Sequence, residues 1–284
     1  MFENIIVIGS GTVANRCAKI LKTKNYNPLF CEILDNSIFS SKNFCSANEI
    51  DFIQVEKKEI KDYFLNISAK TLIVSASNRY LFPLDILLKE NISVINYHGS
   101  LLPKFPGRNA EAWAIFEGER IGGITWHYVV TDIDAGDLII QKSTPISSKT
   151  TSVSLLRDYS ILAINAFEEI IDGVISDTIV SKPQNSSQKE SIRYSWVKPN
   201  EGELDLDWDG TKISVFLRAM NYGPLKTFGE PFFRYNQQTY TFSKYEISEN
   251  EDFENISNFE LSKLYFCIQK NSNKFILKNL KISK

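Results

Sequence analysis

The stretch NIIVIGSGTVANRCAKIL, residues 4–21, decides the fold that the sequence predicts. It begins as a β-branched run, passes through a glycine turn and continues with apolar residues at helical spacing, which predicts a strand, a turn and a helix. Further strand-like runs, most of them continuously apolar as in buried parallel strands, follow at residues 29–34, 51–55, 71–77 and 93–98. Such strands, alternating with helical or loop segments, predict an α/β domain on a Rossmann-like, mostly parallel sheet.

The strand pattern changes after residue 121. GGITWHYVV, residues 122–130, alternates along its length and is followed by LIIQKSTPI, residues 138–146, so we expect the sheet to turn antiparallel here. Residues 151–175 carry apolar side chains at helical spacing and predict a helix that packs across the sheet. After a polar segment and one helix at 211–220, short aromatic and β-branched runs predict a smaller β-rich, OB-like domain.

Composition limits the classes of protein that this chain can represent. With 284 residues, 43% of them hydrophobic and 23% charged, it is an ordinary globular chain for which two domains are expected. The formal net charge of -2 disfavours a broad nucleic-acid-binding surface. The four cysteines lack metal-ligand or CxxC spacing, and no signal peptide or transmembrane run is visible. We therefore predict a cytoplasmic protein with reduced thiols and no membrane partner.

The glycine turn itself allows three interpretations. Gly9, Gly11 and Ala14 fit a dinucleotide fingerprint, but the acidic residue expected about 20 positions on has only Glu32 or Asp35 as candidates. A helix that begins behind a glycine turn also binds isolated phosphate groups through its free backbone N–H groups. The third interpretation is a tight turn without a ligand.

A second stretch carries more chemical information, namely INYHGSLLPKFPGRN at residues 95–109. Asn96 and His98 are two positions apart, so a strand presents both side chains on one face. Downstream, TDIDAGD supplies three aspartates, Asp132, Asp134 and Asp137. Singly, a histidine or a turn aspartate is more often structural, but an Asn, a His and an Asp together can support acyl transfer without a protein nucleophile.

NYHGSLLPKFPGRN followed by GGITWHYVVTDIDAGD resembles the folate-dependent formyltransferase superfamily, which includes glycinamide ribonucleotide, methionyl-tRNA and sugar N-formyltransferases. The 38 positions between Asn96 and Asp134 fit that resemblance. It implies that Asn96, His98 and Asp134 are catalytic, that 10-formyltetrahydrofolate supplies the formyl group, and that no metal is required. Asn96 and His98 would donate hydrogen bonds to the developing oxyanion, while Asp134 would hold the imidazole and accept the proton of the amine.

The resemblance also suggests the domains and the binding residues. It makes residues 1–183 a formyltransferase catalytic domain, 184–199 a linker and 200–284 the C-terminal β-rich domain. His127 is expected to be structural. The residues expected to bind the folate are Asn78, Arg79, Tyr80, Leu81, Val130 and Ile133. Those assigned to the acceptor substrate are Gly9, Gly11, Thr12, Lys104 and Asn109.

Residues 195–228 limit the choice of acceptor amine, because they resemble the start of the C-terminal domain in methionyl-tRNA and sugar formyltransferases. The acidic balance favours a nucleotide-linked amino sugar, dTDP-linked or similar, for a surface polysaccharide such as O-antigen. Methionyl-tRNA or a carrier-bound aminoacyl group is the alternative, so tRNA is disfavoured but left open. A non-catalytic Rossmann-like binding protein and an NAD-dependent oxidoreductase are the hypotheses from other classes. A homodimer is compatible with the resemblance.

Overall fold

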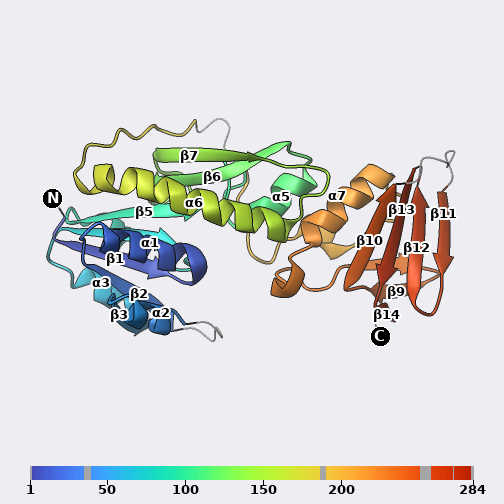
Figure 1. Ribbon diagram of the computed structural model, residues 1–284, viewed down its shortest axis with the longest axis horizontal. Helices are drawn as coiled ribbons and strands as arrows, with labels where there is room; N and C mark the ends of the chain where they lie inside the picture. The colour runs from blue at the N-terminus through green and yellow to red at the C-terminus, as the bar shows by residue number, and fades with distance from the viewer. Residues whose placement is uncertain (1, 35–39, 186–189, 250–256, 271, 283–284) are drawn as a thin grey trace. The chain divides into compact units, whose positions relative to one another are not determined.

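The computed structural model describes residues 2–34, 40–185, 190–249, 257–270 and 272–282. The chain forms two compact units that interleave along the sequence (Figure 1). The first unit comprises Met1–Gly107, Gly122–Thr144 and Arg157–Ile192, and the second comprises Arg108–Ile121, Pro145–Leu156 and Arg193–Lys284. The domains predicted from the sequence are contiguous instead, and their boundaries stay a prediction. Residues 186–189 of the predicted linker lie outside the described residues.

The first unit is built on a seven-stranded sheet with the strand order β3-β2-β1-β4-β5-β6-β7. Strands β1 to β5 are parallel, and β6 runs antiparallel to β5. This confirms both the mostly parallel sheet and the change of direction expected after residue 121. The bounds of the strands are β1 Asn4–Gly9, β2 Pro28–Leu34, β3 Asp51–Glu56, β4 Thr71–Ala76, β5 Ile92–His98, β6 Ile121–Tyr128 and β7 Leu138–Pro145.

Helices cover this sheet because apolar side chains line both of its faces. The longest helix, α6 (Ser152–Ile175), packs on the antiparallel part, as the apolar spacing predicted. There the indole Nε1 of Trp126 donates to the carbonyl of Ala163 at 3.0 Å, and the ring of Phe167 lies 5.1 Å from the Trp126 ring. The shorter helices are α1 Gly11–Thr23, α2 Lys42–Ala47, α3 Ile60–Leu65, α4 Leu84–Leu87 and α5 Ala110–Phe116, the last of which belongs to the second unit.

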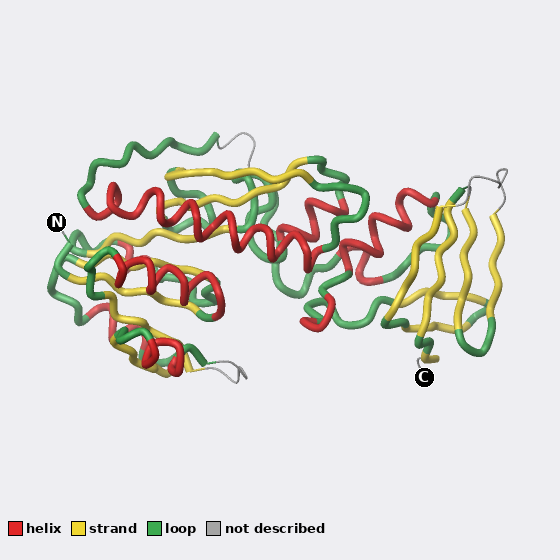
Figure 2. The backbone as a smooth tube through the Cα atoms, viewed as in Figure 1, coloured by secondary structure: helices red, strands yellow, loops and turns green. Residues whose placement is uncertain are grey.

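The second unit contains two antiparallel sheets, of four and three strands (Figure 2). Helix α7 (Gly210–Met220) buries Phe216 in the same apolar cluster as Phe233 and Phe266 of the sheets, whose rings lie 4.5 Å apart. The predicted β-rich C-terminal part is therefore confirmed. Its strands are β8 Phe232–Tyr235, β9 Gln238–Thr241, β10 Lys244–Glu249, β11 Ser257–Leu261, β12 Tyr265–Lys270, β13 Asn273–Lys278 and β14 Lys281–Ile282, in the orders β10-β13-β12-β11 and β14-β9-β8.

Within the described part of the chain, no helix combines the length and the apolar character that crossing a bilayer requires.

The glycine turn after β1 is explained by backbone packing. Gly9 has φ +145°, and a Cβ atom there would lie 1.8 Å from the carbonyl oxygen of Ala76 on β4. Gly11 has φ +75°, but a Cβ atom at this position would meet nothing within 4 Å. The first glycine therefore lets β1 and β4 approach each other, whereas the second serves only the backbone conformation.

We predict that Gly9→Ala lowers the free energy of unfolding by about 2 kcal/mol or more, because backbone atoms must move to admit the methyl group. Gly11→Ala is the matched control, with an expected cost of about 1 kcal/mol for the left-handed conformation alone. Urea unfolding measures both. Equal losses in the two variants would contradict the packing explanation.

Candidate active site

Three polar side chains form one row across the sheet. The parallel register places Ser75 of β4 beside Asn96 of β5, and the antiparallel register places Asn96 opposite His127 of β6. Hydrogen bonds connect the row: Ser75 Oγ donates to Asn96 Oδ1 at 2.8 Å, and Asn96 Nδ2 lies 3.2 Å from His127 Nε2. His98 follows two residues after Asn96 and is buried at the end of β5. Strand register therefore gathers the amide and the two imidazoles.

Asp134 faces this row from the loop between β6 and β7. Its Oδ2 lies 3.5 Å from Nδ1 of His98, and its Oδ1 lies 3.5 Å from Nε2 of His127. The backbone N–H of Gly107 donates to Oδ2 at 2.7 Å, and Gln184 Nε2 donates to the Asp134 carbonyl at 2.8 Å. The structure thus brings the three predicted catalytic residues together: His98 faces the Asp134 carboxylate directly, and Asn96 is connected to it through His127.

The two neighbouring aspartates are placed differently. Asp132 and Asp137 are both exposed, and Asp137 Oδ2 accepts a hydrogen bond from Ser181 Oγ at 3.4 Å. Asp134 takes a left-handed backbone conformation, with φ +51°. Two residues later, a Cβ atom on Gly136 would lie 1.9 Å from the carbonyl oxygen of Tyr128. The Asp-x-Gly pattern therefore has a steric cause, since the loop must pass close to β6 to present the carboxylate.

The His98 ring is held between two groups that only accept hydrogen bonds. Its Nε2 lies 2.8 Å from the carbonyl oxygen of Phe105, and its Nδ1 faces Asp134. The second distance, 3.5 Å, is too long for a well-formed hydrogen bond. Nε2 carries the hydrogen that the Phe105 carbonyl accepts, so Nδ1 has a hydrogen to donate to a bound molecule only when the ring is protonated.

The Asp134 carboxylate remains charged although it is mostly buried. Burial by itself raises the pKa of this carboxyl group, but His98, His127 and the Gly107 N–H lower it by more, so the net pKa is well below its usual range. A charged carboxylate beside two imidazoles can orient them and accept a proton. Within the described residues, no group of three His, Cys, Asp or Glu side chains is arranged to hold a metal ion.

A cavity of about 260 Å³ lies where β1 and β4 end. It is lined by Gly9 of the β1 turn and by the loop after β4 at residues 78–80, together with Lys57 and Glu32. The loop is linked to the polar row, because Asn78 Nδ2 donates to Ser75 Oγ at 3.3 Å. Three residues predicted to bind the folate and one predicted to bind the acceptor, Gly9, therefore share one cavity.

The other predicted binding residues do not line this cavity. Leu81 is 70% exposed and Val130 is 43% exposed, whereas Ile133 is partly buried next to Asp134. Asn109 belongs to the second unit, where it precedes α5 in a left-handed conformation. The remaining three, Gly11, Thr12 and Lys104, are exposed. Their roles stay predictions.

The dinucleotide interpretation has a specific weakness at Glu32. Both of its carboxylate oxygens are engaged: Oε2 accepts from Ser41 N at 2.6 Å, and Oε1 accepts from Ser40 Oγ at 2.7 Å and Gln54 Nε2 at 2.9 Å. Glu32 thus ties its own strand to neighbouring segments, which leaves it poorly placed to bind a ribose. The other candidate, Asp35, lies outside the described residues.

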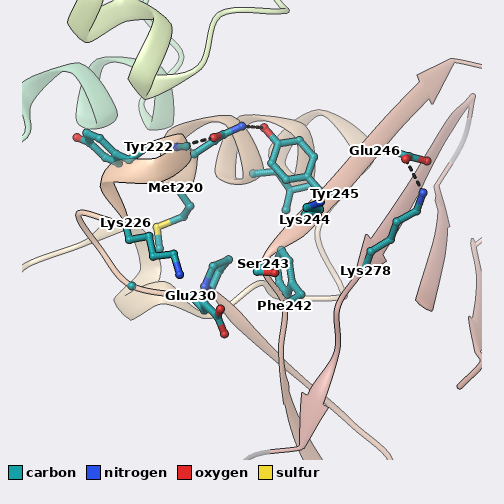
Figure 3. Close-up of a pocket in the computed structure, with 15 residues that line it drawn as sticks. Met220, Tyr222, Lys226, Glu230, Phe242, Ser243, Lys244, Tyr245, Glu246 and Lys278 are labelled. Atoms are coloured by element: carbon teal, nitrogen blue, oxygen red, sulfur yellow. Dashed lines mark hydrogen bonds and ion pairs between the residues drawn. The ribbon is translucent and has the colours of Figure 1, made fainter. Parts of the chain in front are cut away.

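A larger cavity, of about 440 Å³, lies within the second unit (Figure 3). Asn221 Nδ2 donates to the Tyr245 hydroxyl at 2.9 Å. The close-up shows Lys278 paired with Glu246. Met220 contributes an apolar side chain to the lining. No residue that the sequence predicts for catalysis or binding lines this cavity.

Sequence reasoning missed the part that His127 takes in the site. His127 is expected to be structural, but its ring contacts both Asn96 and Asp134 and is 2% exposed. Its alternating strand was visible in the sequence, whereas the register that sets it opposite Asn96 was not. Ser75 was missed for the same reason.

Comparison with known proteins finds a likeness to formyl transferases. Residues 35–170 match the family model described as formyl transferase. The chain is 31% identical over 213 residues to methionyl-tRNA formyltransferase of Fusobacterium nucleatum, covering 70% of this chain and 61% of the relative. It is 29% identical over 186 residues to that of Lactobacillus delbrueckii, covering 64% and 58%. The chain is therefore similar to formyl transferases over residues 35–170, and it spans only about three-fifths of the length of these relatives.

Solved structures support the fold over nearly the whole chain. WlaRD, described as a sugar 3N-formyl transferase in the presence of dTDP and 5-N-formyl-THF, matches with a TM-score of 0.74 and 18% identity, over 98% of both chains. An N-formyltransferase from Helicobacter canadensis, in complex with folinic acid and dTDP-3-aminofucose, matches with a TM-score of 0.73 and 17% identity, over 98% of this chain and 99% of that one. At such identities the likeness establishes the fold alone.

The lowered pKa of Asp134 predicts how stability depends on pH. Because the folded-state pKa lies below the unfolded value of about 3.9, the charged carboxylate stabilises the fold above that pH, and its contribution is lost as the pH falls. Relative to Asp134→Asn, the wild-type free energy of unfolding should fall by about 1 kcal/mol between pH 5 and pH 3. Urea unfolding of both proteins across this range measures the difference. Parallel pH profiles would show that Asp134 is not held in its charged form.

Proposed function

We propose that this protein transfers the formyl group of 10-formyltetrahydrofolate to a primary amine. The observation that carries the proposal is that His98 contacts the mostly buried Asp134 carboxylate directly, that Asn96 is connected to it through His127, and that a cavity lies beside these residues. The match of residues 35–170 to the formyl transferase family model supports the same reaction. The chain needs no nucleophile of its own, because the amine attacks the formyl carbon directly.

The site residues would act on charge that develops during transfer. As the amine nitrogen bonds to the formyl carbon, the carbonyl oxygen becomes an oxyanion that needs donors already in position. One N–H of Asn96 Nδ2 and, when the His98 ring is protonated, its Nδ1–H are placed to supply them. Asp134 accepts the proton that the attacking amine loses, directly or through water, and a proton is returned to N10 of the folate as the bond between the formyl carbon and N10 breaks.

The folate is proposed to bind against the loop after β4. Asn78, Arg79 and Tyr80 line the cavity beside the polar row. Asn78 is itself rigidly held, since its Oδ1 accepts from the Tyr80 N–H at 3.0 Å and its Nδ2 donates to the Tyr80 carbonyl at 3.2 Å. A loop held in this way can present its backbone groups to a flat, polar ring system such as a pterin. Val130 and Ile133, on the segment that leads into Asp134, are proposed as a second wall.

The acceptor is proposed to be a nucleotide-linked amino sugar. Two sugar N-formyltransferases whose structures contain dTDP or a dTDP-sugar align over 98% of this chain, second unit included. The net charge of -2 also disfavours a long polyanion such as tRNA. The second candidate, methionyl-tRNA, is supported by the sequence relatives, which are methionyl-tRNA formyltransferases.

The catalytic assignment predicts large losses of turnover. Asn96→Ala and His98→Ala should each reduce kcat by about 10²-fold or more, because each removes a donor to the oxyanion. Asp134→Asn should reduce kcat strongly while weakening binding of a folate analogue far less, as expected for an interaction that matters in the transition state. Asp137→Asn is the matched control and should be mild. Steady-state kinetics and analogue titration measure these effects; loss of turnover in Asp137→Asn but not in Asp134→Asn would refute the assignment.

The acceptor assignment predicts which amine is formylated. Purified protein with 10-formyltetrahydrofolate is offered dTDP-linked amino sugars, methionyl-tRNA and a carrier-bound aminoacyl group, and formylated products are detected by mass spectrometry. We expect kcat/KM to be at least about tenfold higher for an amino sugar, a difference of about 1.4 kcal/mol in transition-state binding. If methionyl-tRNA were formylated in preference to every sugar, the amino-sugar proposal would be wrong and methionyl-tRNA would be the acceptor.

A further inference from the structure

We propose that His127 is a positioning residue that keeps the carboxamide of Asn96 turned with its N–H groups toward the reacting carbonyl. The inference rests on the proposed formyl transfer for its catalytic consequence, but the hydrogen-bond arrangement stands on the structure itself. An asparagine amide can face either way, so something must fix which end points to the oxyanion.

The orientation is set first at the backbone of Tyr80. Its N–H, which can only donate, lies 3.0 Å from Asn78 Oδ1 and therefore assigns that atom as the acceptor. The other end of the Asn78 amide, Nδ2, then donates to Ser75 Oγ at 3.3 Å. Since the Ser75 hydroxyl receives that hydrogen, its own hydrogen is left to donate to Asn96 Oδ1 at 2.8 Å.

The opposite end of the chain of hydrogen bonds gives the same direction. Nδ1 of His127 lies 2.8 Å from the carbonyl oxygen of Tyr128, which can only accept, so Nδ1 carries the hydrogen. In the neutral ring, Nε2 is then an acceptor, and it lies 3.2 Å from Asn96 Nδ2. Five hydrogen bonds thus run one way from Tyr80 N–H to Tyr128 C=O, and the amide of Asn96 is fixed between them.

This arrangement leaves one hydrogen of Asn96 Nδ2 for the substrate. The amide has two N–H bonds, and His127 takes only one of them. If the amide turned over, Oδ1 would face the oxyanion and repel it. The Ser75 hydroxyl would then receive two N–H groups, with its own hydrogen unpaired. His127 therefore acts through Asn96 and has no need to touch the substrate.

Asp134 is the charged group that competes for His127. Its Oδ1 lies 3.5 Å from the same Nε2, against 3.2 Å for Asn96 Nδ2, and its Oδ2 faces His98. A protonated His127 would donate Nε2–H to Asp134 and confront the Asn96 amide with a second donor. The neutral ring, with its hydrogen on Nδ1, is the form that keeps Asn96 oriented.

The first test reads the tautomer without any turnover. The chain has only two histidines, so the imidazole nitrogens of ¹⁵N-labelled protein give a simple NMR spectrum, and His98→Gln assigns the signals. At neutral pH we expect His127 to show a protonated Nδ1 and an unprotonated, hydrogen-bonded Nε2. An imidazolium at His127, or a hydrogen on Nε2 alone, would overturn the proposal even if formyl transfer were confirmed.

The second test measures whether His127 acts through Asn96. His127→Leu should lower kcat by about 10-fold to 10²-fold with little change in folate-analogue binding, and His127→Gln, which can restore an acceptor, should recover part of the loss. In an Asn96→Ala background, His127→Leu should cost less than about twofold, because the group it positions is absent. If His127→Leu lowered kcat by the full factor in that background as well, His127 would act through Asp134 and not through Asn96. If wild-type protein formylates no amine, the proposed function fails while the NMR result stands.

Discussion

The Asp134 carboxylate is the constraint on which the site depends. It is mostly buried, and the neighbouring His98 and the backbone N–H of Gly107 help to hold its pKa well below the usual range. A charge kept away from water in this way is costly to leave unpaired, so the groups around it cannot vary independently. The left-handed turn at Asp134 and the close passage of Gly136 along Tyr128 are the backbone features that deliver this carboxylate to the sheet.

The sheet supplies the other half of the site through its register. Ser75, Asn96 and His127 are neighbours because β4, β5 and β6 are paired with one particular alignment, and a shift by one residue would turn the Asn96 side chain to the opposite face. The change from parallel to antiparallel pairing occurs at this same place. The strand that carries His127, β6, leads directly into the loop that holds Asp134, so one short segment contributes two groups to the site.

The glycine turn after β1 predicted the local structure correctly but left open whether a ligand binds there. Gly9 was recognisable as the turn of a β-turn-α unit, but its close approach to Ala76 accounts for the glycine without any bound phosphate. The same turn lines the cavity beside Asn78, which is compatible with a substrate role. A glycine pattern alone could not separate these two explanations, because both require a backbone without a side chain.

The sequence by itself determined the fold class, the order of the elements and the grouping of Asn96, His98 and Asp134, because periodicity and local motifs are written along the chain. The β-rich character of the C-terminal part was equally visible in its short aromatic runs. Only the tertiary structure decided that α5 and residues 145–156 belong to the second unit, and that Ser75 and His127 complete the polar row. These features depend on contacts between residues that are 20 or more positions apart, and the physical terms that fix them, strand register and the pairing of buried polar groups, exist only once the sheet has formed.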